Sequence, residues 1–562
     1  MDYRKNYEAW LSSEWIDEET KKELRSLTDE KEIEDRFHQS LEFGTAGLRG
    51  ILEAGSNRMN KYTVGLATEA FARVIEKAGE EAKKRGVVLG YDVRHFSKEF
   101  SELAAGIFAS HGIHVAIYKE IAPTPMVSFA IRELHAFAGV MMTASHNPRE
   151  YNGYKAYGQD GSQILDDIAD AVSGEMAKMK DFSEIQWMDF EEGMKSGMID
   201  YISEDLIEDY YHRIVALSLH DDIDYGIRVA YTPFNGTGNI PVREVLRRKG
   251  YENIMVVPEQ ELPDPDFKTV GYPNPEDPKG FKMAEVFAKE NDAELILGTD
   301  PDCDRAAIEV RDANGEYAFL NGNKIGALLI HDILTSLHER GEIPENGVIV
   351  KSIVTGDLGK SIASKLGVET KESLTGFKNI CGLANEYERT GEKTFLFGYE
   401  ESIGYVYRDF VRDKDAVNSS FMIVEMAAYY KKRGKSLLDV LAELYEEQGY
   451  YFERVNSYVL KGLDGQERIK RMMVDFRENP LVSLGELTHD RTEDYLKGVG
   501  DIPKSNVLKF FFQDGSWYAI RPSGTEPKIK VYMSVVGRDE TDALEKIRLI
   551  TEATEKKMDA VK

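Results

Sequence analysis

Along the chain, segments with apolar residues at helical intervals alternate with short, nearly continuous apolar runs. From residue 60 to 85 they recur at helical intervals, and Gly86 ends this stretch. Nearly continuous apolar runs follow and are predicted as strands: residues 87–93, 114–118 and 136–142. Helical patterns separate them at residues 97–111 and after Pro125. Strands that are apolar throughout are typical of a sheet covered on both faces, so this stretch predicts a β-α-β-α-β unit with a parallel sheet.

The same alternation returns twice. Strands of the second unit are predicted at residues 227–231, 254–257 and 293–298, with helices at 242–248 and 281–289. Strands of the third are predicted at 348–354 and 394–397, with helices at 358–366 and from Leu383 onward. Although the repeat has no even sequence period, we interpret it as three related α/β domains.

The end of the chain has a different pattern. An apolar stretch at residues 507–520 is interrupted by Asp514 and Gly515, as in a β-hairpin, and residues 528–535 alternate before an amphipathic C-terminal helix. This predicts a smaller α+β domain. We therefore place four domains at residues 1–205, 206–321, 322–450 and 451–562.

Charge and cysteine content narrow the classes of function. The 562 residues include 71 Lys and Arg against 99 Asp and Glu, a net charge of −28 that repels nucleic acid and anionic membranes. The chain has only two cysteines, Cys303 and Cys381, which suits a reducing compartment. We see no apolar leader and no apolar run approaching the length of a membrane span. We therefore expect a cytoplasmic protein without nucleic-acid or membrane partners.

A polar cluster follows one strand of each α/β unit, where open α/β sheets bind ligands. In the first, Ser145, His146 and Asn147 can form a nucleophile with a neighbouring acid or base, or only an Asn-Pro turn. A serine-hydrolase elbow is disfavoured, because it needs glycine where Thr143 and Asn147 stand.

The second cluster holds Asp300, Asp302 and Asp304 within five residues. Three carboxylates in one folded loop repel each other unless a cation compensates, which favours a hard metal such as Mg²⁺ or Mn²⁺ over a solvated acidic turn. An EF-hand is disfavoured, because Arg305 and Arg311 stand where its glycine and last glutamate belong.

Three further segments carry candidate chemistry. Residues 521–530 combine hydroxyls, a glycine and basic side chains, which suits a phosphate clamp, although a tight turn between strands would have the same composition. Residues 398–402 offer carboxylates and a hydroxyl for sugar hydroxyls. The glycine-rich stretch 42–50 carries Arg49, which can face a phosphate or solvent.

Together, and in this order, four of these motifs resemble the loops of the α-D-phosphohexomutase superfamily, over nearly the whole chain. Thr-Ala-Ser-His-Asn-Pro resembles its phosphoserine motif, Asp-Pro-Asp-Cys-Asp-Arg its metal loop, Glu-Glu-Ser its sugar-binding loop and Arg-Pro-Ser-Gly-Thr-Glu-Pro its phosphate-binding loop. Residues 375–378 and 55–60 look most like the phosphoglucomutase and phosphopentomutase branch. The resemblance implies four domains around a central cleft, the first three with related mixed α/β sheets and the last an α+β domain that is more loosely attached.

The resemblance also implies roles for single residues. Ser145 would carry the phosphoryl group, and three aspartates would hold Mg²⁺ together with the serine-bound phosphate: Asp300, Asp302 and Asp304. Three side chains match family positions near the removal of the sugar proton: His146, Lys155 and Arg49. The substrate-binding positions are Arg305, Gly376, Phe377, Lys378, Glu400, Ser402, Arg521, Ser523, Gly524 and Thr525.

The activity implied is the interconversion of glucose 1-phosphate and glucose 6-phosphate through glucose 1,6-bisphosphate, which also serves as primer, by a monomer or homodimer. Ile403, Gly404 and Tyr405 depart from the commoner aromatic-glycine continuation of the sugar-binding loop. Pentose or dual hexose specificity therefore stays open, and a phosphopentomutase, a phosphomannomutase and a sugar-bisphosphate synthase are the alternatives. A non-catalytic sugar-phosphate-binding scaffold is disfavoured, because a pure binder needs no nucleophile beside a metal loop.

Overall fold

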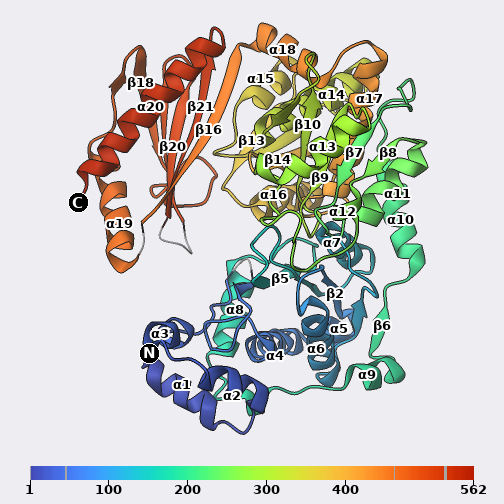
Figure 1. The fold of residues 1–562 in the computed structure, drawn as a ribbon, viewed down its shortest axis with the longest axis vertical. Helices are drawn as coiled ribbons and strands as arrows, with labels where there is room; N and C mark the ends of the chain where they lie inside the picture. Colours follow the sequence, from blue (N-terminus) through green and yellow to red (C-terminus); the bar gives the residue numbers. More distant parts are fainter. Residues whose placement is uncertain (1, 45–46, 461, 524–527) are drawn as a thin grey trace. The chain divides into compact units, whose positions relative to one another are not determined.

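The computed structural model describes residues 2–44, 47–460, 462–523 and 528–562 (Figure 1). The chain forms two compact units. The first comprises Met1–Leu320, Cys381–Glu386 and Gly404–Lys432, and the second comprises Asn321–Ile380, Tyr387–Ile403 and Arg433–Lys562. No helix in the described part of the chain is both long enough and apolar enough to cross a membrane.

The first sheet is mixed and has the strand order β1-β5-β4-β2-β3-β6. Its strands are β1 (Leu48–Ile51), β2 (Val87–Tyr91), β3 (Val115–Ile117), β4 (Ala138–Met142), β5 (Tyr151–Gly158) and β6 (Ile199–Tyr201). The helices around it are α4 (Lys61–Ala78), α5 (Glu80–Arg85), α6 (Ser97–Ser110), α7 (Thr124–Glu133), α8 (Asp166–Met176) and α9 (Phe190–Ser196), with a 3₁₀ turn at Phe182–Glu184. Helices α4 and α6 lie on one face of the sheet and α7 on the other, so β2 and β4 are buried throughout.

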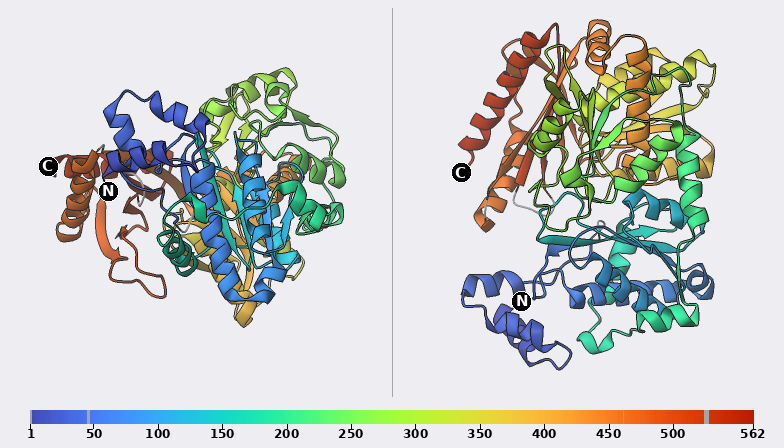
Figure 2. Two further views of the ribbon diagram at one scale, coloured as in Figure 1. Left: turned by 90° about the horizontal axis from the view of Figure 1, so that it is seen from below. Right: turned by 45° about the vertical axis from the view of Figure 1, so that its right-hand side comes forward.

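Three short helices precede this sheet: α1 (Tyr3–Ser12), α2 (Glu18–Arg25) and α3 (Glu30–Phe37). Tyr7, Trp10 and Phe37 pack edge to face in a small core of their own, to which Tyr62 of α4 also belongs. Figure 2 shows these helices gathered at the N-terminal end of the first unit. This aromatic core attaches them to the first helix of the α/β domain.

The second sheet has the order β11-β10-β9-β7-β8 and lies in the same unit. Its strands are β7 (Val229–Thr232), β8 (Ile254–Val256), β9 (Leu295–Thr299), β10 (Ala306–Arg311) and β11 (Tyr317–Leu320). Its helices are α10 (Glu204–Val215), α11 (Asn239–Lys249), α12 (Pro258–Glu261) and α13 (Lys282–Glu290), with a 3₁₀ turn at Pro278–Phe281. Strands β7, β8 and β9 are parallel, whereas β10 turns back on β9 as a hairpin.

The third sheet contains three parallel strands in the second unit: β13 (Glu369–Ser373), β12 (Gly347–Ser352) and β14 (Thr394–Glu400). Helices α14 (Gly322–Glu339), α15 (Leu358–Lys365), α16 (Phe377–Thr390) and α18 (Leu437–Gln448) belong to this region. The segment Gly404–Lys432, with β15 (Gly404–Tyr407) and α17 (Ala416–Lys432), belongs to the first unit.

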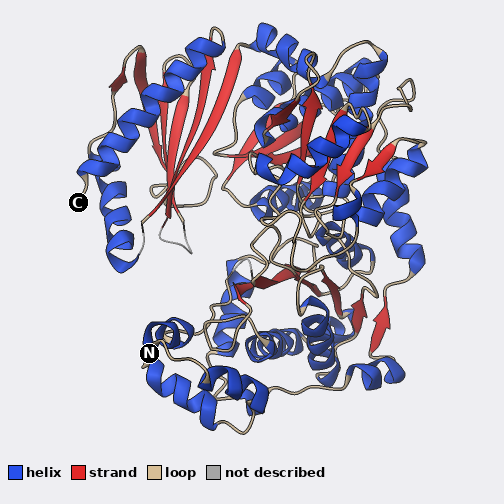
Figure 3. Ribbon diagram, in the orientation of Figure 1, coloured by secondary structure: helices blue, strands red, loops and turns tan. Residues whose placement is uncertain are grey.

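The fourth sheet is antiparallel, with the order β16-β21-β20-β19-β18-β17 (Figure 3). Its strands are β16 (Tyr450–Val459), β17 (Ser483–Leu484), β18 (Leu487–Asp494), β19 (Leu508–Phe512), β20 (Trp517–Pro522) and β21 (Lys528–Gly537). Helices α19 (Gly462–Glu478) and α20 (Glu540–Ala560) share an apolar core with one face of the sheet. From the other face, Trp517 and Tyr532 pack against Ile353 and Val354, which follow β12.

The three α/β arrangements of sheet and helices and the final α+β arrangement are present as predicted. The predicted domain boundaries stay predictions. The single helix expected at residues 60–85 is wrong: Gly79, with φ of +100°, separates α4 from α5. Strand β14 runs three residues beyond the predicted end at Phe397 and includes Glu400. Strands β5, β13 and β16 were not predicted, because their side chains are mostly polar or do not alternate.

Candidate active site

Ser145 stands in a loop that begins where β4 ends. Its φ of +51° lies in the left-handed region, which costs a residue with a side chain roughly 1–2 kcal/mol. The Ser145 amide donates to Thr143 Oγ1 at 2.8 Å, and Thr143 Oγ1 donates to Asp92 Oδ2 at 2.6 Å. Gly153 of the adjacent strand passes so close that a Cβ there would lie 2.5 Å from the Thr143 carbonyl oxygen. The surrounding structure therefore holds the strained serine in place.

The Ser145 hydroxyl points at the acidic loop. Its Oγ donates to Asp300 Oδ2 at 2.8 Å and lies 3.3 Å from His146 Nδ1. Ser145 as a whole is 4% exposed. The tertiary fold thus brings two of the sequence-predicted motifs, 155 residues apart, into hydrogen-bond contact.

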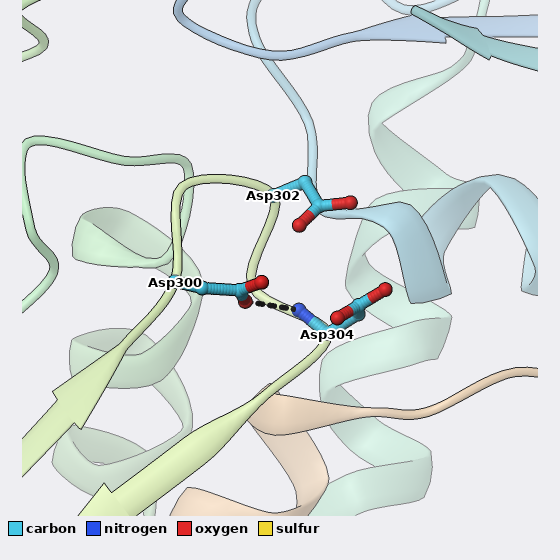
Figure 4. Close-up of side chains that lie close together, drawn as sticks. All are labelled: Asp300, Asp302 and Asp304. Atoms are coloured by element: carbon cyan, nitrogen blue, oxygen red, sulfur yellow. Dashed lines mark hydrogen bonds between the residues drawn. The ribbon is translucent and has the colours of Figure 1, made fainter. Parts of the chain in front are cut away.

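The acidic loop is the turn of the β9–β10 hairpin. Asp300 follows β9, and its Oδ1 accepts the amides of Asp304 and Arg305 at 3.0 Å each. All three aspartates are buried, and each offers a carboxylate oxygen within 4.8 Å of the others (Figure 4). The backbone hydrogen bonds fix the turn and leave the carboxylates gathered in one place.

Two lysines offset part of this negative charge. Lys155 of β5 places Nζ 2.6 Å from Asp302 Oδ2 and 2.9 Å from Asp304 Oδ2, and Lys414 Nζ lies 3.1 Å from the same Asp304 oxygen. Thr124 Oγ1 donates to Asp302 Oδ2 at 2.8 Å. The Oδ1 atoms of Asp302 and Asp304 are buried and accept no hydrogen bond in the described structure. Arg305 Nε adds a weaker contact, 3.7 Å from Asp304 Oδ1. Acceptors left over, and no ion pair to Asp300 among the described residues, fit a hard cation with oxygen ligands.

The pKa values of the cluster show the same imbalance. Burial and the charges of Asp302 and Asp304 raise the pKa of Asp300 well above its ordinary value. Burial also opposes ionisation of Asp304, but Lys155, Lys414 and Arg305 outweigh it and lower that pKa. Burial disfavours the Lys155 ammonium, yet the two aspartates outweigh burial and raise its pKa. The Asp300 carboxylate thus stays undercompensated, although Arg305 opposes the rise of its pKa.

His146, Lys155 and Arg49, the three candidates for proton transfer, all belong to the first unit. Burial, then the positive charges of Arg305 and Arg49, lower the pKa of His146 well below its ordinary value, so the imidazole is neutral. Arg49 of β1 donates from Nη1 to Asn147 Oδ1 at 3.0 Å. Lys155, by contrast, is an ammonium held by aspartates.

The sugar-binding and phosphate-binding candidates lie in the second unit. Gly376, with φ of +107°, donates its amide to Glu400 Oε1 at 2.7 Å and caps α16, whose first residues are Phe377 and Lys378. Glu400 ends β14, and Ser402 lies in the turn after it. The backbone before α16 thus contributes one hydrogen bond to the Glu400 carboxylate.

Arg521 lies near the end of β20, and Ser523 donates its amide to the Lys528 carbonyl at 2.7 Å across the base of the next loop. Burial and the charge of Glu401 raise the pKa of Tyr532, and Arg521 opposes this shift. Arg521 and Glu401 therefore both interact electrostatically with this tyrosine. Gly524 and Thr525 lie outside the described residues.

Several residues of the site were not predicted from the sequence: Asp92, Arg94, Thr124 and Lys414. Asp92 and Arg94 follow the carboxyl end of β2. The rule that located Ser145 and Asp300, a polar cluster after a buried strand, would have found these two as well. Thr124 and Lys414 carry no such signal, since only the tertiary fold brings them to the aspartates.

Four family models match the chain in order. They are described as phosphoglucomutase/phosphomannomutase α/β/α domain I at residues 40–182, domain II at 208–315, domain III at 321–448 and the C-terminal domain at 482–556. Phosphoglucomutase of Staphylococcus haemolyticus is 36% identical over 513 residues, which cover 89% of this chain and 91% of that protein.

Solved structures share the fold. Parafusin (phosphoglucomutase) from Paramecium, in an open form, aligns with a TM-score of 0.70 at 18% identity, over 92% of this chain and 95% of that one. N-acetylphosphoglucosamine mutase of Aspergillus fumigatus, in complex with GlcNAc-6P and magnesium, aligns with a TM-score of 0.54 at 13% identity, over 93% and 97%.

Proposed function

The chain belongs to the phosphoglucomutase/phosphomannomutase family, and on this basis we propose that it interconverts glucose 1-phosphate and glucose 6-phosphate by way of a phosphorylated Ser145. The relatives that cover about nine tenths of the chain carry the name phosphoglucomutase. The observation that carries the residue assignment is the 2.8 Å contact between Ser145 Oγ and Asp300 Oδ2, inside a buried cluster of three carboxylates.

Asp300, Asp302 and Asp304 would hold the metal, which we propose to be Mg²⁺. When bound, it would offset negative charge on the transferring phosphoryl group. The leftover acceptors of Asp302 and Asp304 and the raised pKa of Asp300 support this assignment.

The protein's own residues position the serine and move the proton. In the transfer from enzyme to sugar, the bond between Ser145 Oγ and phosphorus breaks as a sugar hydroxyl oxygen bonds to phosphorus. The hydroxyl proton passes to His146, the neutral member of the three candidates, which returns it to the Ser145 alkoxide; Lys155 and Arg49 already hold their protons and would contribute positive charge instead. His146 Nδ1 lies 3.3 Å from Ser145 Oγ.

The remaining candidates would hold the substrate. We assign the sugar hydroxyls to Glu400 and Ser402, beside Gly376, Phe377 and Lys378. We assign the phosphate that is not transferred to Arg521, Ser523, Gly524 and Thr525, and charge compensation at the reacting phosphate to Arg305. Glucose 1,6-bisphosphate would form when Ser145 gives up its phosphoryl group, and would return its other phosphate to the serine after turning over.

A coupled assay of glucose 1-phosphate conversion, with Mg²⁺ and glucose 1,6-bisphosphate, tests the proposal. We expect Ser145→Ala to abolish turnover, since no other group can carry the phosphoryl between the two positions. Ser196→Ala, which removes a helix-end serine bonded only to the Gly193 carbonyl in the described structure, is the matched control. Equal activity of Ser145→Ala and the wild type would refute the phosphoserine. Turnover of mannose or ribose 1-phosphate but not of glucose 1-phosphate would keep it and change the substrate.

A further inference from the structure

Arg94 makes a set of contacts that the proposed chemistry does not use. Its side chain is fully buried, and its guanidinium donates to four backbone carbonyls. The acceptors are the carbonyl oxygens of Ser145 at 2.6 Å, Asn147 at 2.5 Å, Pro148 at 2.9 Å and Tyr151 at 2.9 Å. All four lie in the loop that carries the phosphoserine candidate or at the start of β5, so one side chain spans the whole turn.

The neighbouring Asp92 ties the other side of the same loop. Its Oδ2 accepts Thr143 Oγ1, which in turn accepts the Ser145 amide. Its Oδ1 accepts the Arg94 amide at 2.9 Å and Ser97 Oγ at 2.8 Å. Arg94 Nε also lies 3.4 Å from Asp92 Oδ2. We call Asp92, Arg94 and Thr143 the serine bracket.

The face of the guanidinium is covered from the neighbouring domain. Phe267, which is fully buried, places its ring centroid 5.1 Å from Arg94 Cζ. The next residue, His95, lies with Nε2 3.0 Å from Asp266 Oδ1. Phe267 and Asp266 precede the metal loop in the same predicted domain, so the bracket also contacts the part of the chain that carries Asp300.

From these contacts we propose that Arg94 is a positioning residue, which holds the Ser145 loop in one conformation whether or not the serine is phosphorylated. The proposal rests on the proposed function. Each cycle removes and restores a dianionic group on Ser145 Oγ, and a loop held through Oγ would shift with it. None of the four Arg94 contacts involves Oγ, so they persist through the cycle. The planar fork of arginine suits several fixed acceptors, which the single ammonium of lysine cannot replace.

The test compares Arg94→Lys with the wild type and with Arg85→Lys. Arg85 is the matched control, because it also donates to two backbone carbonyls, those of His135 and Ala136, at the opposite ends of the strands of the same sheet. We expect kcat of Arg94→Lys to fall about 10²-fold, as for a misplacement of reacting groups by about 1 Å, with KM for glucose 1-phosphate unchanged. Arg85→Lys should leave both constants unchanged.

Amide hydrogen exchange supplies a readout that does not depend on turnover. In Arg94→Lys we expect faster exchange in residues 145–151 and wild-type exchange in the strands of the sheet. Wild-type kcat and wild-type exchange in Arg94→Lys would overturn the proposal, and so would a fall in kcat with no change in exchange at 145–151. If the wild type itself converts no sugar phosphate, the proposed function fails, while the exchange comparison still decides whether Arg94 holds the loop.

Thr143 provides a second test if Arg94→Lys does not fold. Thr143→Val removes the oxygen that accepts the Ser145 amide, whereas Thr143→Ser keeps it. We expect Thr143→Val to lower kcat and speed exchange at Ser145, and Thr143→Ser to restore both. Wild-type kcat and wild-type exchange in Thr143→Val would show that the serine is held without the bracket.

Discussion

Two clusters of buried charge, one in each unit, are built on opposite principles. In the first unit, Lys155 and Lys414 face three aspartates, and buried carboxylate oxygens of Asp302 and Asp304 accept no hydrogen bond in the described structure. Arg305 adds a weaker contact 3.7 Å from Asp304, but no ion pair reaches Asp300 among the described residues, and burial and the charges of its neighbours raise the pKa of Asp300. Such a cluster is complete only with a cation.

The cluster of the second unit is balanced. Lys351 Nζ lies 3.0 Å from Asp357 Oδ1 and 3.3 Å from Glu372 Oε1, and Lys509 Nζ lies 3.9 Å from Glu372 Oε2. Trp517 Nε1 donates to Asp357 Oδ2 at 2.7 Å, and Lys509 donates to the Ile353 carbonyl at 2.7 Å. Together with the half-exposed Lys360, 3.3 Å from Glu372 Oε1, these lysines and carboxylates join β12 and β13 to the fourth sheet.

The pKa values record this balance. Burial alone would raise the pKa of Glu372, but Lys351 and Lys509 outweigh it and lower that pKa to about 2. A balanced buried cluster contributes to holding structure together, whereas an unbalanced one keeps capacity for a ligand. The comparison teaches that the compensation of charge, rather than burial, distinguishes a cluster that closes on itself from one that could take a cation.

The largest effect is expected when the unbalanced cluster loses a charge. Asp300→Asn should lower kcat by at least about 10³-fold, the scale on which transition-state charge stabilisation is lost. Without metal, the same variant should be at least as stable as the wild type in urea, because a repelling charge is removed and the amide oxygen can still accept the Asp304 and Arg305 amides.

A chelator sharpens this prediction. It should lower the melting temperature of the wild type but not that of Asp300→Asn, because binding to the native state alone stabilises it. Asp312→Asn, in the surface turn between β10 and β11, is the control for a changed charge. A destabilised, metal-free Asp300→Asn would contradict the comparison.

Removing a lysine from the balanced cluster should lower the free energy of unfolding, unlike the Asp300→Asn change. Lys351→Met leaves Asp357 and Glu372 with less compensation, so the free energy of unfolding should fall by about 3–5 kcal/mol, as for broken buried ion pairs. Lys360→Met, which removes an exposed partner 3.3 Å from the same Glu372 oxygen, should cost less than about 1 kcal/mol. Urea unfolding of both variants checks the difference, and equal losses would show that burial does not matter here.

The smallest effect is a pH dependence. Burial lowers the pKa of Lys509 from 10.5 to about 8, with Glu372 opposing. Between these two values the unfolded chain binds more protons than the native one, so this lysine makes stability rise with pH from about 8 to about 10.5 and costs stability below that window. Lys509→Met should remove about 1–3 kcal/mol of this rise. The free energy of unfolding of both proteins at pH 7.5 and 10.5 measures this rise. An equal rise in Lys509→Met and the wild type would show that another group causes it.

The predictions from sequence succeeded where local pattern and structure coincide. Strands β2 and β4 are apolar at every position because helices cover both faces, and the periodicity showed this. Strand β13, with Glu369, Lys371 and Glu372 among its five residues, pairs in parallel with β12, and no element was predicted there. Strand formation there is decided by the neighbouring strand and by Lys351, which compensates Glu372.

The candidate site divides in the same way. Ser145 and the three aspartates were predicted as site residues because they form polar clusters after buried strands and match motifs of the family, and their roles stay predictions. Lys414 and Phe267 lie far along the chain from Ser145 and became visible only as neighbours in space. Gly524 and Thr525 stay predictions.

By itself the sequence determined the chemistry available to this protein: a serine and three aspartates at strand ends, and the alternation of helices and strands that buries them. Only the tertiary structure decided how that charge is compensated. Lys155 and Lys414 come from separate segments, and the electrostatic energy of each cluster depends on distances of a few ångströms between residues. Composition and spacing carry no such distances, which is why the balance of each cluster had to be read from the fold.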